Sequence, residues 1–286
     1  MQLKGRFSRR EWMKSAGFLM AAAGTSRCGA PASESLAAEI PIGVQLYCVR
    51  RELAVEMDST LASLAQMGFE GVEFADYFDR SARELRMLLD SNGLKCCGTH
   101  ILLDDMLGDS LKATVEFNQE IGNEYLIVRW LDEERRSSAE TFAQTVGLFN
   151  EIADNLEPHG MRVGYHNHDY IFERFNGEML WNILGNESRS GVVLQLDTGN
   201  AAMVGVDVYE LLERNEGRTA TIHLKPYSAA KPDALIGEDE LDWNRIVDLC
   251  SKTAGTEWYI IEYEREAYPP LEALKANLES FKEVLA

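Results

Sequence analysis

Eight short apolar runs alternate along this chain with segments whose apolar residues recur at helical spacing. Repeated strand-then-helix units predict a parallel sheet, because parallel strands need a crossover long enough to hold a helix. Eight such units in about 250 residues match the size of a (β/α)8 TIM barrel. The expected strands are residues 42–47, 71–74, 94–98, 125–130, 161–165, 192–196, 219–224 and 258–263.

A doubly wound open sheet shows the same alternation, and the turn after the first strand separates the two folds. An open sheet that binds a nucleotide commonly has a glycine-rich turn there. Here Tyr47 is followed by Cys48, Val49, Arg50 and Arg51, with no glycine. The sequence therefore favours the α/β barrel, whose active site should lie where the strands end.

Helix boundaries can be predicted from capping residues. We expect helices to start near residues 58–60 and at Asp242, because Asp, Ser and Thr are good N-caps. Gly68, Gly93 and Gly160 should follow helix ends, since glycine adopts the left-handed backbone that closes a helix.

Residues 1–38 are interpreted as an export signal and linker, and residues 39–286 as a single barrel domain. Arg9 and Arg10 precede an uncharged, largely apolar stretch at 15–24, and small residues follow it. The stretch is about half of the roughly 20 residues that span a bilayer, which is typical of a cleavable signal. The paired arginines resemble the signal of the twin-arginine pathway. We therefore expect an exported protein, located in the periplasm.

Charge and cysteine usage narrow the classes of partner. The net charge of −19 disfavours nucleic acid, whose binding depends on clustered lysine and arginine. No further apolar stretch approaches spanning length, so we expect no membrane span in the mature chain. The four cysteines after the signal show no CxxC spacing, and we expect buried thiols instead of disulfides.

Polar clusters follow four of the apolar runs in the second half of the chain. Because parallel strands bring their carboxyl ends to one rim, these clusters should meet. Imidazole and carboxylate together are ligands for a divalent metal such as zinc or manganese. The clusters are residues 166–169, 197–200, 223–225 and 262–264.

With these motifs in order, the chain resembles the xylose isomerase-like TIM-barrel superfamily. That group contains sugar phosphate isomerases and epimerases, inosose dehydratases and endonuclease IV. The resemblance spans the part after the signal. It is carried by Gly71-Val72-Glu73, Tyr165-His166-Asn167-His168, Asp197-Thr198-Gly199-Asn200, Ile222-His223-Leu224-Lys225, Leu241-Asp242-Trp243 and Ile261-Glu262-Tyr263-Glu264.

The resemblance implies one divalent ion, Mn, Co, Zn or Mg, held by residues from strands five to eight. The family's Glu, Asp, His and Glu ligands fall on His166, Asp197, His223 and Glu262. The first is a departure, since an imidazole replaces a carboxylate, and His168 is the alternative ligand on that strand. Imidazole suits the same metals, so binding can survive this change.

A second departure is Asn200. Family members that bind several metals and cut DNA have a histidine at this position. Its absence, together with the acidic composition, disfavours endonuclease activity.

The chemistry implied by the resemblance is proton transfer next to a sugar carbonyl through an enediolate, which a metal ion stabilises. Replacing a glutamate by His166 removes one of the two bases of a symmetric epimerase, which favours isomerisation, dehydration or lyase chemistry. The candidate acids and bases are His168, Glu264 and His100, with Lys225 as a stabiliser of negative charge. Candidate substrate contacts are Glu73, Asn167 and Asn200. The aromatic residues Tyr47, Trp130 and Tyr165 end strands and are candidates either for stacking on a sugar ring or for packing in the barrel.

The expected substrate is a small unphosphorylated carbohydrate, because no glycine-rich phosphate cradle occurs. Barrels of this kind often form homo-oligomers, although no exposed apolar stripe requires one here. A non-catalytic sugar-binding protein on the same barrel is the alternative.

Overall fold

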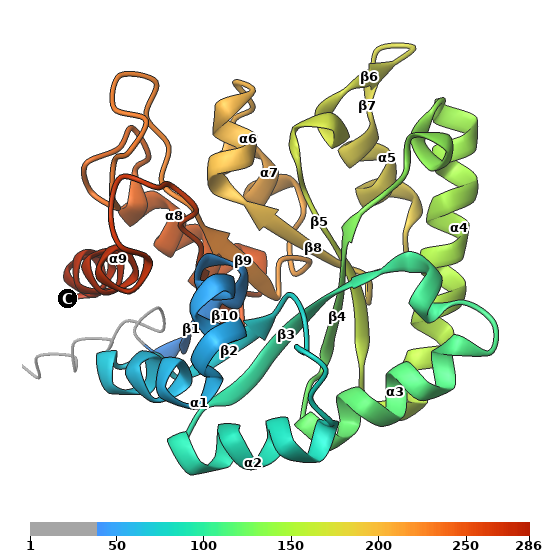
Figure 1. Cartoon of the computed structure of the whole chain (residues 1–286). Coiled ribbons are helices and arrows are strands. Elements are labelled where there is room, and N and C mark those ends of the chain that lie inside the picture. Colours follow the sequence, from blue (N-terminus) through green and yellow to red (C-terminus); the bar gives the residue numbers. More distant parts are fainter. Residues whose placement is uncertain (1–38) are drawn as a thin grey trace, which may run out of the picture. The chain divides into compact units, whose positions relative to one another are not determined.

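The computed structural model describes residues 39–286, and the expected export signal at 1–38 lies outside them. Eight parallel strands close into a barrel in the order β1-β10-β9-β8-β5-β4-β3-β2 (Figure 1). The strands are β1 Ile42–Gln45, β2 Gly71–Phe74, β3 Lys95–Leu102, β4 Tyr125–Trp130, β5 Arg162–His166, β8 Val193–Asp197, β9 Thr221–Leu224 and β10 Trp258–Ile261.

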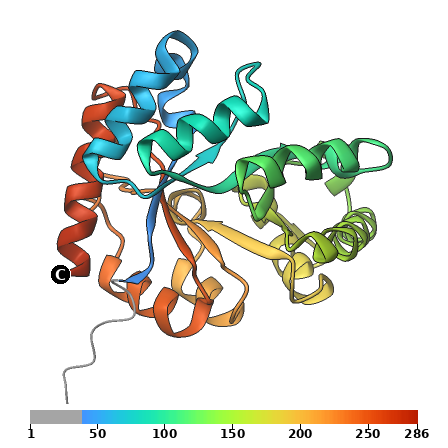
Figure 2. The same ribbon diagram turned by 90° about the horizontal axis from the view of Figure 1, so that it is seen from below.

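Helices follow the strands and surround the barrel, as the view turned by 90° also shows (Figure 2). This confirms the predicted α/β barrel. The α-helices are α1 Arg50–Met67, α2 Ala82–Asn92, α3 Ser110–Ile121, α4 Ala139–Leu156, α5 Leu180–Glu187, α6 Thr198–Met203, α7 Val208–Arg214, α8 Trp243–Leu249 and α9 Pro270–Leu285. Short 3-10 turns are η2 Leu46–Val49, η3 Leu103–Met106, η4 Glu133–Arg136, η5 Glu157–His159 and η6 Asp169–Phe172, and η7 Cys250–Ala254 is a π-helical turn.

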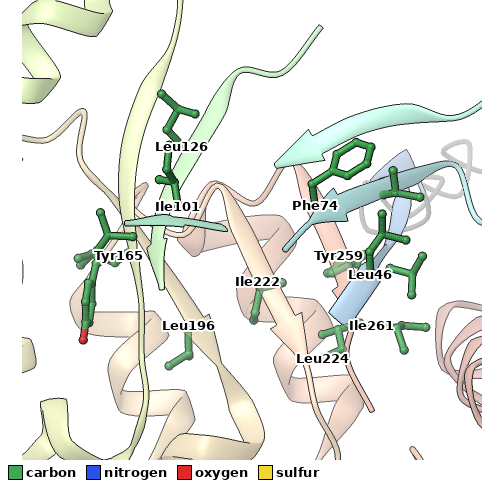
Figure 3. Close-up of a cluster of buried hydrophobic side chains, with 14 of the residues drawn as sticks. Leu46, Phe74, Ile101, Leu126, Tyr165, Leu196, Ile222, Leu224, Tyr259 and Ile261 are labelled. Carbon is green, nitrogen blue, oxygen red and sulfur yellow. The ribbon is translucent and has the colours of Figure 1, made fainter. Parts of the chain in front are cut away.

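The strand residues alternate between two environments. Tyr165, Leu196 and Ile261 point away from the barrel interior into the buried apolar layer beneath the helices (Figure 3). Because successive side chains point to opposite faces, the residue after each of them points into the barrel. The apolar runs thus bury one face under the helices and aim polar residues at the interior.

The barrel interior is layered from the amino ends of the strands to the carboxyl ends. Along β8, three inward residues are Val193, then Gln195, then Asp197. Val193 belongs to a small apolar cluster with Tyr125 and Ile127, which fills the lower part of the barrel. Gln195 and Asp197 lie above it and are fully buried. The apolar cluster therefore supports a polar layer, and the polar layer supports the strand-end residues.

Two predicted helix boundaries differ in outcome. Asp242 caps α8 by accepting from the backbone N–H of Arg245, as expected. The first helix begins at Arg50, so the predicted helix start near residues 58–60 was wrong. Its backbone is non-helical at Glu56, and the Thr60 hydroxyl donates to the Glu56 carbonyl oxygen at 2.8 Å. The N-cap signal therefore marks a restart after a kink.

The glycine expectations are confirmed. Gly68, Gly93 and Gly160 each close a helical segment with a left-handed backbone. The cysteines Cys48, Cys96, Cys97 and Cys250 are buried free thiols, so no disulfide occurs among residues 39–286. Within the same residues, no helix is long and apolar enough to cross a bilayer.

One element was missed. A hairpin of β6 Arg174–Phe175 and β7 Glu178–Met179 lies between β5 and α5. Asn176 and Gly177, both at positive φ, form its turn, and Asn-Gly is a strong signal for a two-residue hairpin.

Candidate metal centre

The structure brings the four predicted metal ligands together at the carboxyl ends of β5, β8, β9 and β10. Each offers one ligand atom, these atoms all lie within 4.8 Å of one another, and all four residues are buried. His166 and Asp197 end their strands, His223 lies one residue before the end of β9, and Glu262 directly follows β10. Strand order and side-chain alternation thus assemble residues that are nearly one hundred positions apart.

Asp197 carries the clearest sign of a cation site. Its Oδ1 accepts from the backbone N–H of Asn200 at 2.6 Å, but its buried Oδ2 has no hydrogen-bond partner among the described residues. Oδ2 lies 4.0 Å from both His166 Nε2 and His223 Nδ1. Two ligand atoms that each lie about 2.0–2.2 Å from one ion are separated by up to about this distance. The donor set therefore fits a divalent ion.

Charge at Asp197 supports the same conclusion. Burial raises the pKa of Asp197 to about 7, and the negative charge of Glu262 adds to that effect, although Lys225 opposes it. An ionised carboxylate in such surroundings needs a compensating cation, because a buried unpaired charge is costly. A metal ion would provide that compensation.

His223 is held between two carboxylates. Its Nδ1 lies 2.6 Å from Glu262 Oε2 and its Nε2 lies 2.6 Å from Glu73 Oε2. Burial lowers the pKa of His223, but the two carboxylates outweigh it and raise the pKa to about 10. Without a metal the ring is therefore an imidazolium, and the Nδ1 proton occupies the side that a metal ion would take.

His166 is held as a neutral ligand by Gln195. Its Nδ1 lies 3.0 Å from Gln195 Oε1, an acceptor, so Nδ1 carries the proton and Nε2 presents a lone pair towards Asp197. The Gln195 amide cannot flip, because its Nε2 donates to Glu73 Oε1 at 2.7 Å and to Thr221 Oγ1 at 2.9 Å. Burial, His223 and His100 hold the pKa of His166 well below its usual value. The replacement of glutamate by histidine is therefore compatible with metal binding.

The expectation that Glu73 contacts substrate does not match its position. Its side chain is fully buried below the ligands and accepts from Gln45 Nε2 at 2.6 Å, besides Gln195 and His223. Burial raises the pKa of Glu73, but the neighbouring imidazoles of His100 and His223 outweigh it and lower that pKa. Glu73 therefore positions His223 and Gln195. This type of partner orients metal-binding imidazoles and raises their basicity.

Sequence reasoning missed Gln45 and Gln195. Each interrupts a run of apolar residues in a buried strand, which is the signal that identifies such positioning groups.

Asn167 and Asn200 were predicted to contact substrate, but their side chains form hydrogen bonds with the protein backbone. Asn167 Oδ1 accepts from the Asp197 backbone N–H at 2.6 Å, and its Nδ2 donates to the Asp197 carbonyl at 3.2 Å. Asn200 Nδ2 donates to the Asn167 carbonyl at 3.0 Å. The two amides therefore fasten the end of β5 to the end of β8, and they hold the ligands of those strands in register.

Lys225 lies among carboxylates. Its Nζ is 2.7 Å from both Glu262 Oε1 and Glu264 Oε2, and 3.8 Å from Asp197 Oδ2. Burial alone lowers the pKa of Lys225, but Glu262 and Asp197 outweigh it and raise the pKa well above its usual value. Its first role is thus charge compensation, and its ammonium group does not line the cavity described next.

A cavity of about 530 Å³ opens above the ligands. His100, His166 and Glu262 contribute to its lining near the metal cluster. His100 Nε2 contacts Gln195 Oε1 at 2.9 Å, and its ring stacks on that of His223.

The predicted acid or base residues His168 and Glu264 also line this cavity. Burial lowers the pKa of His168 to about 4, and its Nδ1 has no hydrogen-bond partner among residues 39–286. Burial and Glu262 raise the pKa of Glu264.

Two of the three aromatic candidates lie in the cavity wall. Tyr47 and Trp130 are 44% and 46% exposed, which leaves their rings available to a ligand. Tyr165 points to the opposite face of β5 and packs edge-on against Phe149 of α4. Tyr165 therefore follows the packing alternative and not the substrate contact, because the residue next to an inward His166 must point outward.

A TIM barrel with a buried His2AspGlu cluster at its carboxyl rim defines the class of this protein. A family model described as xylose isomerase-like TIM barrel matches residues 61–284. The chain therefore belongs to the xylose isomerase-like TIM-barrel family.

Solved structures share this fold. A sugar phosphate isomerase/epimerase from Parabacteroides distasonis has 19% identity and a TM-score of 0.74, over 86% of this chain and 96% of that one. The IOLI protein with a binding zinc atom has 15% identity and a TM-score of 0.67, over 86% and 98%. An L-ribulose 3-epimerase has 15% identity and a TM-score of 0.63, over 86% and 94%. A comparison with curated protein sequences finds no match.

Proposed function

We propose that this protein is a divalent-metal-dependent enzyme that moves a proton next to the carbonyl of an unphosphorylated sugar or keto-sugar. The observation that carries the proposal is the partnerless Oδ2 of Asp197, buried among His166, His223 and Glu262 beneath an open cavity. When bound, the metal ion supplies Lewis acidity that favours loss of a proton beside a carbonyl group.

The residues around the cavity support a reaction with one carboxylate base outside the metal cluster. His166 cannot replace the missing glutamate as a base, because Gln195 occupies Nδ1 and Nε2 faces the cluster. Glu264 lines the cavity and is paired with Lys225, whose positive charge opposes the effect of burial and Glu262 on the Glu264 pKa. We assign proton abstraction to Glu264 and hydroxyl binding to His168. This arrangement favours an isomerase, dehydratase or keto-glycoside lyase over a two-glutamate epimerase.

Deuterium exchange tests the proposed reaction. The metal-loaded protein is incubated in D2O with a panel of unphosphorylated ketoses and keto-glycosides, and NMR follows each C–H bond next to the carbonyl. We expect exchange or conversion of at least one compound, and a large loss of rate in Glu264→Gln. Turnover confined to sugar phosphates would contradict the proposal.

A non-catalytic carbohydrate-binding protein is the second candidate, and Lys225 is the observation that favours it. Its ammonium group already places one positive charge between Asp197, Glu262 and Glu264. Yet Glu73 adds a fourth carboxylate, so that without a metal Lys225 and the His223 imidazolium supply two positive charges against four carboxylates. We therefore prefer the enzyme, and metal content decides between the two.

We also propose that the protein is exported through the twin-arginine pathway and acts in the periplasm. The support is sequence alone: Arg9 and Arg10, the short apolar stretch that follows, and the small residues beyond it. A periplasmic enzyme meets few phosphorylated metabolites, which agrees with an unphosphorylated substrate.

A further inference from the structure

Arg129 is a half-buried arginine in the cavity wall without an acidic partner. It lies in β4 and lines the same cavity as His100 and His166. Its Nη1 donates to the carbonyl oxygens of Ala75 at 3.3 Å and His100 at 3.4 Å, beside the ends of β2 and β3. Among residues 39–286, no carboxylate forms an ion pair with it within 4.0 Å. The guanidinium is thus anchored at one nitrogen, and its charge is uncompensated.

Other partly buried arginines show what a purely structural guanidinium looks like. Arg218 uses all three nitrogens: Nε on the Val192 carbonyl at 3.0 Å, Nη1 on the Gly185 carbonyl at 3.1 Å, and Nη2 on the Ser188 hydroxyl at 2.8 Å. Arg162 is paired with Glu257 at 2.6 Å. In Arg129, by contrast, Nε and Nη2 have no acceptor among the described residues. This free edge holds two parallel N–H donors, the pattern that a carboxylate accepts in a bidentate manner.

A second arginine is in the same wall. Arg50 lies over the Tyr47 ring at 3.9 Å and donates to the Tyr47 carbonyl at 2.7 Å, without an acidic partner within 4.0 Å among residues 39–286. The cavity therefore combines two unpaired cations with the carboxylates of Glu262 and Glu264. Two arginines without an acidic partner in the wall of one cavity favour an anionic ligand there.

A singly charged anion fits this wall better than a phosphate. Asp76 and Glu264 also line the cavity and would repel a dianion. One planar guanidinium edge matches the two oxygens of a carboxylate. A phosphate commonly needs several cations or a cradle of backbone N–H groups, and the sequence has no glycine-rich phosphate cradle.

We propose that Arg129 binds a carboxylate of the substrate, and that the substrate is a polyhydroxy carboxylic acid of the sugar-acid type. This inference rests on the proposed function, since it names the substrate class of the same cavity. Arg129 holds the acid end through Nε and Nη2, while Nη1 keeps the guanidinium fixed beside His100. The hydroxyl-bearing carbons then extend towards His166 and Glu262.

Calorimetric binding to the metal-loaded protein tests this inference. The probes are D-gluconate and D-glucitol, which share their polyhydroxy chain and differ in a carboxylate or a hydroxymethyl group at one end. D-glucose 6-phosphate distinguishes a carboxylate from a phosphate. We expect gluconate to bind more tightly than glucitol, and Arg129→Gln to weaken gluconate about tenfold to a hundredfold, the value of a charge-assisted hydrogen-bond pair.

The controls separate a local contact from general charge. Arg83→Gln, on the exposed surface of α2, makes the same change of charge and should leave gluconate binding unaltered. Arg129→Lys should recover only part of the affinity, because lysine lacks the bidentate edge. Glucitol binding should not change in Arg129→Gln.

Several results would overturn the assignment. They are equal affinity for gluconate and glucitol, binding of neither, a preference for glucose 6-phosphate, or an equal loss in Arg83→Gln. None of these removes the proposed function, which depends on metal content and on deuterium exchange. Conversely, if the purified protein contains no metal, the proposed function fails, and the preference for gluconate over glucitol is then judged by itself.

Discussion

At the scale of single residues, the position of each imidazole nitrogen decides what the residue can do. His166 Nε2 faces Asp197, whereas His168 lies in the cavity wall two residues further on. We predict that His166→Ala weakens metal binding at least about a hundredfold, since it removes a ligand, and that His168→Ala retains nearly full affinity. Competition with a chromogenic chelator measures both. If only His168→Ala loses the metal, the ligand on β5 is His168 and not His166.

Gln195 provides a test of the buried support below the ligands. Its Oε1 fixes the proton on His166 Nδ1, and no other described side chain contacts that nitrogen. We predict that Gln195→Leu, which nearly keeps the volume but removes the side-chain hydrogen bonds to His166, His100, Glu73 and Thr221, weakens metal binding about tenfold to a hundredfold. Chelator competition again provides the readout. Unchanged affinity would show that packing alone orients His166.

The four candidate ligands could be predicted from sequence because each lies within one residue of the end of an apolar strand. The roles of Glu73, Asn167 and Asn200 could not, because they depend on how deep each side chain lies in the barrel. That depth is set by the stagger of neighbouring strands. A register shift between Val72 and Glu73 is one example.

At the scale of elements, the close contact between β2 and β3 limits the size of the side chain at position 98. A Cβ on Gly98 would lie 2.6 Å from Glu73 Oε1, closer than any unstrained contact. We predict that Gly98→Ala displaces Glu73, lowers the free energy of unfolding by about 1–3 kcal/mol and weakens metal binding. Urea unfolding and chelator competition measure the two effects.

The matched control is Gly147→Ala in α4, where a Cβ meets nothing within 4 Å. This change should stabilise the protein by about 0.5–1 kcal/mol, because alanine favours a helix over glycine. A Gly98→Ala protein as stable as Gly147→Ala would contradict the close approach to Glu73.

Element type was predicted better than element length. β3 runs to Leu102, four residues beyond the expected end, because Thr99–Leu102 pairs with β4 although its composition is mixed. β1 ends at Gln45, earlier than expected, because the Gln45 side chain accepts from the Tyr47 N–H and closes a 3-10 turn. Pairing and local capping, which periodicity does not show, set both ends.

At the scale of the whole molecule, the proposed export signal concerns where the protein works. We predict that Arg9→Lys together with Arg10→Lys prevents export, because the pathway recognises the arginine pair. Cell fractionation of the full chain, with Arg6→Lys as the control, measures this. Periplasmic accumulation of the double variant would contradict export by this route.

The barrel, the carboxyl rim and the charge balance together lead to one central claim, a divalent ion bound by His166, Asp197, His223 and Glu262. Mass spectrometric metal analysis of protein purified without chelator tests it most directly. We expect about one Mn, Co, Zn or Mg ion per chain in the wild type. Asp197→Asn should lose that ion and remain folded by circular dichroism. Wild-type protein without near-stoichiometric divalent metal would contradict metal binding by these four residues.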